Sequence, residues 1–217
     1  MCSHYESVKD NNRLKAHFRA DDIPEGLKFD MWPGYAGLFL RKHEFADVGD
    51  EAVPPLEVLL GSFGLIPHWA TDTKIAKNTY NARSETVAEK PSFRDAWRTG
   101  RRCIIPADAI YEPDWRTGKA VPTRICLADG EPMGIAGLWS SWKSPKGEIV
   151  HSYTMLTINA DSHPMMRLFH KPTDEKRMVV ILNEGDYDQW LTTDAVSCRA
   201  LLQEYPADLL IANATQR

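Results

Sequence analysis

The chain has 217 residues, 43% of them hydrophobic and 26% charged, which is typical of a globular protein with a core of its own. Its formal net charge of −4 argues against a protein that coats nucleic acid by bulk attraction. We find no apolar stretch long enough to cross a bilayer, so we expect no membrane segment and a cytoplasmic location. The four cysteines, at positions 2, 103, 126 and 198, form no CxxC pair or zinc-spaced cluster, so we expect no metal, cofactor or disulfide.

The first half of the chain is predicted to contain two helices and two strands. Residues 6–20 are expected to form a short polar helix, and residues 37–42 and 56–66 two strands. Residues 86–97 are expected to be helical with an interruption at Pro91, which cannot donate a backbone hydrogen bond.

The second half is dominated by apolar runs of strand length, with turn residues between them. These runs are residues 102–106, 123–127, 133–139, 153–158 and 178–182. The third and fourth runs are expected to form a long hairpin, and residues 186–191 and 194–203 two helices. We predict a single α+β domain over residues 1–217. Its core is a mixed, mainly antiparallel sheet, strand-rich and barrel-like, with flanking helices and a helical tail at 183–217.

Positive charge is concentrated between residues 74 and 102, where eight basic side chains face three acidic ones. A basic stripe on an acidic body suits a groove that follows phosphates. A solvated helix face with paired charges would give the same composition. Charge alone leaves both interpretations open.

Cys2 has the most distinctive chemistry. A small second residue favours removal of Met1, and the freed α-amine, with a pKa of about 7.7–8.0, is partly neutral near pH 7.5. Such an amine forms an imine with an aldehyde, and the neighbouring sulfur then closes a five-membered thiazolidine ring. A cysteine at this position also occurs by chance.

Three further groups carry possible site chemistry. Asn81 and Arg83 lie on one face if their segment is extended, and there they would orient a nucleophile and grip a phosphate; a plain helix entry fits equally. Glu112 follows an apolar strand, where burial would raise its pKa for proton transfer, although a strand-end acid in water is the simpler alternative. His170 suits acid–base work near neutral pH, or a structural role.

Eight stretches, taken in order, resemble the SOS-response-associated peptidase (SRAP) family, whose members shield abasic DNA. They are Met1-Cys2, Trp32-Pro33-Gly34, GLIPHW at 64–69, NARSET at 81–86, RCIIPA at 102–107, Tyr111-Glu112, AGLW at 136–139, and Phe169-His170 with Arg177-Met178. The resemblance implies an enzyme that bonds Cys2 covalently to the ring-opened sugar of an abasic site in single-stranded DNA, as a thiazolidine crosslink. It also implies self-removal of Met1, or hydrolysis that reverses the adduct. We expect a monomer, nucleoid-associated when bound to DNA, and the sequence names no protein partner.

The resemblance assigns roles to matched positions. Cys2 would form the bond, Asn81 would hold its end of the site, Glu112 would assist imine formation, and His170 would protonate the sugar ring oxygen. Trp69 would stack on a base. The DNA-contacting set is expected to be Arg83, Trp69, His4, Arg177, Lys77 and Pro33.

The chain departs from the family pattern at several of these places. The departures are Ser3-His4 for Gly-Arg, Asp30 for Asn, Pro113 for Trp, Val179 for Pro, and a seven-residue spacing from His170 to Arg177 in place of two. The longer spacing predicts either a re-aimed histidine or a changed preference for DNA structure.

Two other functions fit parts of the sequence. An N-terminal-nucleophile cysteine hydrolase or peptidase would use Cys2 against an amide, with an oxyanion hole and no need for the basic stripe or Trp69. A non-covalent single-strand-binding module would leave Cys2 incidental.

Overall fold

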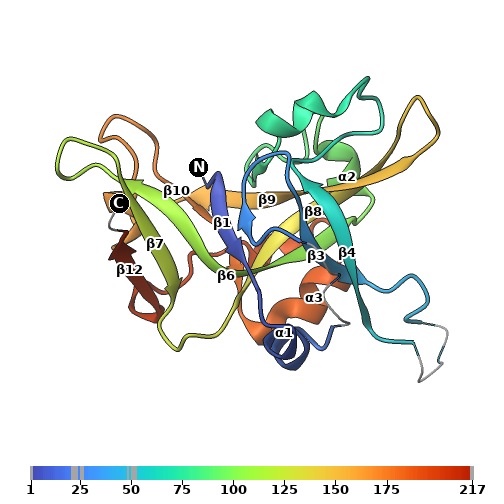
Figure 1. Cartoon of the computed structure of the whole chain (residues 1–217), viewed down its shortest axis with the longest axis horizontal. Coiled ribbons are helices and arrows are strands. Elements are labelled where there is room, and N and C mark those ends of the chain that lie inside the picture. The colour runs from blue at the N-terminus through green and yellow to red at the C-terminus, as the bar shows by residue number, and fades with distance from the viewer. Residues whose placement is uncertain (1, 21–23, 25–26, 48, 50–52, 216–217) are drawn as a thin grey trace.

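The core of the fold is a ring of five strands within a 12-stranded sheet (Figure 1). The computed structural model describes residues 2–20, 24, 27–47, 49 and 53–215. The ring strands are β3 (Ala36–Lys42), β4 (Leu56–Phe63), β6 (Arg102–Asp114), β8 (Met133–Lys143) and β9 (Ile149–Asn159). In ring order β8 pairs with β9, β9 with β4, β4 with β3, β3 with β6, and β6 again with β8. Within the ring the β4–β9 pair alone is parallel, and outside it β5 pairs parallel with β9, which confirms the predicted mixed, mainly antiparallel, barrel-like sheet.

Seven shorter strands extend this ring. They are β1 (His4–Ser7), β2 (Asp30–Met31), β5 (Asn81–Arg83), β7 (Val121–Leu127), β10 (Arg177–Val179), β11 (Ile181–Leu182) and β12 (Leu210–Ala214). β1 pairs with β6, and β5 and β10 both pair with β9. Each of these three strands carries a residue that was named from the sequence as a site candidate.

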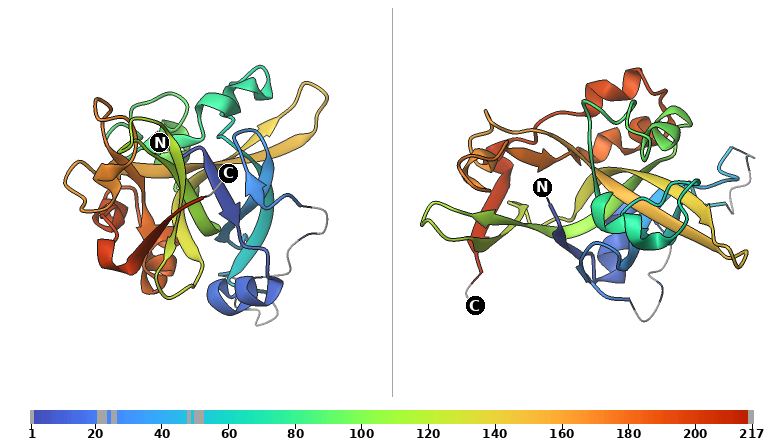
Figure 2. Two further views of the ribbon diagram at one scale, coloured as in Figure 1. Left: turned by 60° about the vertical axis from the view of Figure 1, so that its left-hand side comes forward. Right: turned by 90° about the horizontal axis from the view of Figure 1, so that it is seen from above.

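The hairpin predicted from the apolar runs is confirmed as β8–β9, paired from Gly137–Met155 to Lys143–Ile149. Its tip and the β7–β12 pair lie at opposite ends of the long axis of the molecule (Figures 1 and 2). Because the polar loop sits at the tip, the apolar halves of both strands lie in the core.

An aromatic cluster fills the space between β1, β3, β4 and β9. The Phe63 and Tyr153 rings are stacked at 5.6 Å, and Tyr5 meets Phe63 edge-on at 5.2 Å. The hydroxyls of Tyr5 and Tyr153 are hydrogen-bonded to each other at 2.5 Å, so neither buried hydroxyl is left without a partner.

The helices are shorter than the sequence predicts. Residues 6–20 contain only α1 (Asn11–Phe18), because Asp10 accepts from the Asn12 N–H as its N-cap and the residues before it belong to β1. Residues 86–97 form turns up to α2 (Arg94–Arg98), since Pro91 and the turns around it delay the helix.

The expected strand and tail boundaries also change. The strand predicted at 102–106 continues to Asp114, so Glu112 lies within it. The strand predicted at 178–182 divides at Val180, whose N–H donates to Leu156 while its carbonyl accepts from Ala136, and the chain thereby passes from β9 to β8. In the tail, the helix predicted at 186–191 is confirmed as α3 (Tyr187–Thr192). The helix predicted at 194–203 is instead a 3-10 turn (Ser197–Leu201). The strand β12 was not predicted from the sequence.

Across the described residues, the helices are all too short or too polar to traverse a lipid bilayer.

Candidate functional site

Cys2 lies just before β1, at the end of that strand that is farther from α1 in Figure 1. Its side chain is 1% exposed, and its thiol donates to the carbonyl of His4 at 3.4 Å. Burial raises the pKa of the thiol above its ordinary value of 9.0, and the negative charge of Glu112 raises it further. The sulfur is therefore a neutral thiol at neutral pH.

Glu112 faces Cys2 from β6 and is also 1% exposed. Its Oε2 lies 2.8 Å from Nε2 of His170, although the contact is not aligned as a hydrogen bond. Within the described part of the chain, neither carboxylate oxygen has a hydrogen-bond partner. Oε2 nevertheless has the His170 ring beside it, so Oε1 is the oxygen left open to a ligand's polar group.

His170 reaches the site from the loop before β10. Its backbone has a φ of 62°, in the left-handed region, and its N–H donates to the carbonyl of Pro113 at 2.8 Å. The preceding Phe169 forms an isolated bridge with Asp114. The end of β6 therefore holds both Glu112 and the backbone of His170, which explains why two residues 58 positions apart meet.

Asn81 lies in β5 and directly follows Tyr80. Its Nδ2 donates to the carbonyl of Tyr80 at 2.8 Å, while its buried Oδ1 has no hydrogen-bond partner among the described residues. Burial raises the pKa of Tyr80, and its electrostatic interaction with Cys2 and Glu112 raises it further. Asn81 carries a second acceptor without a hydrogen-bond partner on the strand that follows Tyr80.

Arg83 is two residues further along β5, on the same face as Asn81, as the extended conformation predicts. Its guanidinium is 47% exposed and pairs with Glu175, at 2.7 Å between Nη1 and Oε2. Glu175 belongs to the segment 171–176, which accounts for the longer spacing after His170.

Arg177, expected at the DNA surface, is only 2% exposed. Its guanidinium pairs with Glu85 and Glu175 and donates to the carbonyl of Thr157 at 2.8 Å. These contacts give Arg177 a structural part in joining β10 to the start of the 84–90 turns, and we leave it out of the DNA-contacting set.

His4 is enclosed rather than free to meet a phosphate. Its ring stacks between Trp32 and Tyr111, at 4.1 Å and 12° from each, and its Nε2 pairs with Asp30. That hydrogen bond lowers the pKa of Asp30. The two departures from the family pattern, His4 and Asp30, therefore pair with each other. The exposed aromatic side chain here is Trp32, and the Pro33 next to it is half-buried.

Trp69 and Lys77 lie on the segment that joins β4 to β5. Trp69 is 49% exposed and lines a pocket of about 720 Å³ with Arg94 and Arg98, and Lys77 is exposed on the 3-10 turn Thr73–Asn78. The basic stripe predicted between residues 74 and 102 therefore adjoins an exposed aromatic ring.

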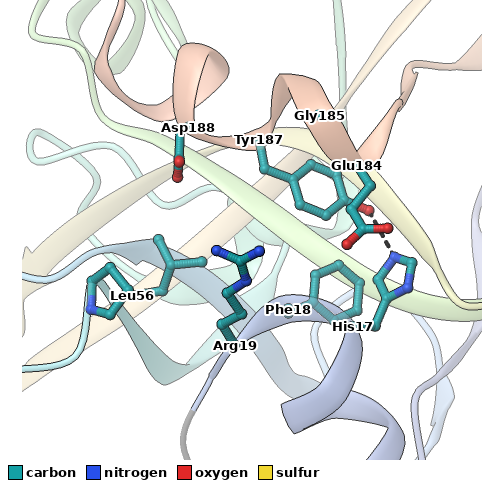
Figure 3. Close-up of a pocket in the computed structure, with 9 residues that line it drawn as sticks. His17, Phe18, Arg19, Leu56, Glu184, Gly185, Tyr187 and Asp188 are labelled. Carbon is teal, nitrogen blue, oxygen red and sulfur yellow. Dashed lines mark hydrogen bonds between the residues drawn. The ribbon is translucent and has the colours of Figure 1, made fainter.

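A second pocket, of about 430 Å³, lies between α1 and the start of α3, at the other end of β1 from Cys2 (Figures 1 and 3). Figure 3 shows His17 bonded to Tyr187, with Arg19 between Glu184 and Asp188. This pocket contributes nothing to the arrangement around Cys2.

The structure thus links Cys2 with Glu112 and Glu112 with His170, and it places Asn81 and Arg83 on β5, directly after Tyr80. Tyr80, Trp32 and Lys176 also belong to this region, and none of them was assigned a role from the sequence. Trp32 lies within the matched stretch Trp32-Pro33-Gly34, and Tyr80 directly precedes the stretch at 81–86, so their position was the available signal.

Comparison with known proteins identifies the family of this chain. The family model described as SOS response associated peptidase (SRAP) matches residues 1–216. Abasic site processing protein YoqW of Bacillus subtilis (strain 168) is 39% identical over 215 residues, covering 96% of this chain and 89% of the relative. Abasic site processing protein HMCES of Rattus norvegicus is 30% identical over 190 residues, covering 73% of this chain and 50% of the relative.

Solved structures show the same fold. A crystal structure of a protein from Bordetella bronchiseptica is similar with a TM-score of 0.89 and 48% identity, covering 100% of both chains. One from Bacteroides thetaiotaomicron is similar with a TM-score of 0.83 at 22% identity, covering 99% of this chain and 92% of that one. The chain therefore belongs to the SOS response associated peptidase (SRAP) family.

Proposed function

We propose that this chain processes abasic sites by forming a covalent thiazolidine between Cys2 and the ring-opened sugar in single-stranded DNA. The observation that carries the proposal is the meeting of Cys2, Glu112 and His170 in one buried site. The relatives named as abasic site processing proteins support the same substrate.

The reaction starts once Met1 is removed and the α-amine of Cys2 is free. The amine nitrogen adds to the C1′ aldehyde of the open sugar, and loss of one water gives an imine. The Cys2 sulfur then adds to the imine carbon, its proton passes to the nitrogen, and the five-membered ring is closed. Aldehyde and aminothiol thus give thiazolidine and water, without any oxidant or cofactor.

The neighbouring groups supply the proton transfers. His170 gives a proton to the ring oxygen as the sugar opens, and Glu112, 2.8 Å from it, exchanges protons with the amine and the departing water. The open Oδ1 of Asn81 accepts an N–H from the amine and holds it toward the aldehyde. Hydrolysis by the same groups would reverse the adduct.

The DNA strand would pass along the exposed face of β5. Arg83 grips a phosphate beside the lesion, and the Trp69 ring stacks on a base near the basic residues of the 74–102 stripe. Lys77 and the Trp32–Pro33 corner extend this surface.

The neutral thiol favours this chemistry over amide hydrolysis by Cys2. A hydrolase of that kind attacks with a thiolate, whereas burial and Glu112 raise the pKa of this thiol. The amine-first route can use the neutral thiol, because a protonated imine is a stronger electrophile than an amide carbonyl and the thiol proton passes to a neighbouring base as the C–S bond forms.

The test is incubation with single-stranded DNA that carries one abasic site, followed by denaturation and a search for a shifted covalent band. The native chain should give a stable band, Cys2→Ala none, and Cys2→Ser at most a labile one. Intact mass should show the loss of one methionine. Amide cleavage without a DNA adduct would instead identify a hydrolase, and binding that persists in Cys2→Ala without a crosslink would identify a non-covalent binding module.

A further inference from the structure

Lys176 holds the loop that carries His170. Its ammonium donates to the carbonyls of three consecutive residues, Phe169 at 2.8 Å, His170 at 3.2 Å and Lys171 at 2.6 Å. Its own backbone N–H donates to Asp161 at 3.0 Å, and its carbonyl accepts from Ala160 at 2.8 Å. Lys176 therefore ties the His170 loop to the end of β9.

The loop needs such a tie because of its backbone. A non-glycine residue at a φ of 62° is in a sparsely populated conformation, which persists only where the surroundings impose it. One support is the Pro113 carbonyl, which accepts from the His170 N–H. The other is Lys176, whose positive charge gathers three carbonyl dipoles that would otherwise repel one another.

A direct DNA contact is the obvious alternative role for a lysine here. An ammonium has three N–H donors, and in this structure three carbonyls accept from them. Lys176 thus has its donors committed inside the protein, whereas Lys171 of the same segment is exposed, with its ammonium over the Trp115 ring at 5.2 Å.

We propose that Lys176 is a positioning residue for His170, holding the imidazole against Glu112 so that it can protonate the sugar ring oxygen. This inference rests on the proposed function. It gives the 171–176 segment, which lengthens the spacing between His170 and Arg177, a role: its last residue, Lys176, holds His170 in place.

The test is a double-mutant cycle on the rate of adduct formation at saturating protein, with Lys176→Met, His170→Ala and the double variant. Loss of the tie should slow the reaction roughly ten- to hundredfold, as expected when a proton donor is misplaced by about 1 Å. Because Lys176 acts through His170, the double variant should react no more slowly than His170→Ala alone. Multiplying defects would overturn the proposal.

Binding and folding are measured on the same proteins. The binding probe is DNA with a tetrahydrofuran analogue, which has no aldehyde. In Lys176→Met its affinity should stay within about twofold of wild type, and the dependence of that affinity on salt should be unchanged. A salt slope lowered by about one would identify a phosphate contact instead. The matched control is Lys171→Met, which removes the same charge from the same segment and should keep the wild-type rate. If Lys176→Met does not fold, Lys176→Gln carries the same comparisons.

The outcomes separate the two proposals. If the wild-type chain forms no adduct, the proposed function fails. If the wild-type chain and Lys176→Met form the adduct at the same rate, the proposed role of Lys176 fails and the proposed function stands.

Discussion

At the scale of single residues, Glu112 has opposite effects on the two reactive groups of Cys2. Its charge, after burial, raises the pKa of the thiol, and in the proposed reaction its carboxylate would serve the proton transfers of the amine. In Glu112→Gln the pKa of the thiol should fall, so at a fixed pH more thiolate is present. We expect faster alkylation of Cys2 by iodoacetamide at about pH 8 and, in the same protein, slower adduct formation.

Peptide mass spectrometry separates alkylation of Cys2 from that of Cys103, Cys126 and Cys198. Glu148→Gln, which changes an exposed acid at the hairpin tip, is the control and should alter neither rate. Alkylation that is unchanged in Glu112→Gln would show that the carboxylate does not act on the sulfur.

The pairing of Arg83 with Glu175 makes a second prediction at this scale. A phosphate that binds Arg83 must displace a carboxylate held at 2.7 Å. Removing that competitor in Glu175→Gln should tighten binding of single-stranded DNA about two- to fivefold, the range of an exposed ion pair worth up to about 1 kcal/mol. Arg83→Ala should weaken binding and lower the salt slope by about one.

Fluorescence anisotropy over a salt series measures both effects. Asp174→Asn removes the same charge from the neighbouring position and should not tighten binding beyond the small gain of any lost acid. A gain from Glu175→Gln that persists in the Arg83→Ala background would contradict competition at Arg83.

At the scale of elements, Gly64 joins β4 to the segment that carries Trp69 and Lys77. Its φ is +121°, and a Cβ added there would overlap the backbone carbonyl of Ala76. Gly64→Ala should therefore cost roughly 2–4 kcal/mol in the free energy of unfolding, from backbone strain and overlap together. Gly147→Ala, at a φ of +87° with open space around it, should cost only about 1 kcal/mol. Urea titration of both variants measures the difference, and equal losses would refute the overlap.

Strands that bury continuous apolar runs were predictable, and those defined by partners were not. β8 and β9 follow from their composition, whereas β1 has the sequence His-Tyr-Glu-Ser and becomes a strand because Tyr5 and Ser7 are buried against β6. β12 was missed for a similar reason, since four of its five residues are exposed and its pairing with β7 defines it.

The candidate site divides in the same way. Cys2, Glu112, Asn81 and His170 were identified in the sequence by their types and by resemblance, because each type has a chemistry of its own. Contacts between distant segments, such as His4 with Asp30 or Arg83 with Glu175, carry no signal in one sequence. The burial of Arg177 was likewise invisible, because a pair of basic residues is normally exposed.

At the scale of the whole molecule, several weakly acidic side chains are buried in the core, among them Tyr5, Cys103 and Tyr153. Burial raises the pKa values of Tyr5, Cys103 and Tyr153 above their ordinary values of 9.0 for the thiol and 10.0 for the phenols. In the folded chain these groups keep their protons at a pH where the unfolded chain loses them. Their contribution to stability is therefore complete below about pH 9 and declines as the pH rises toward the folded pKa values.

We accordingly expect the unfolding free energy to fall above about pH 9, by about 1.4 kcal/mol per pH unit for each group that titrates only on unfolding. Replacing both phenols, in Tyr5→Phe with Tyr153→Phe, removes a hydroxyl pair together and should flatten this decline, because two of the buried groups that titrate only on unfolding are gone. Tyr35→Phe, at an exposed position, should leave the slope as in wild type. Urea unfolding under reducing conditions at several alkaline pH values measures the slope. If the unfolding free energy of the double variant falls with pH as steeply as that of wild type, the alkaline loss of stability arises from groups other than the buried tyrosine pair.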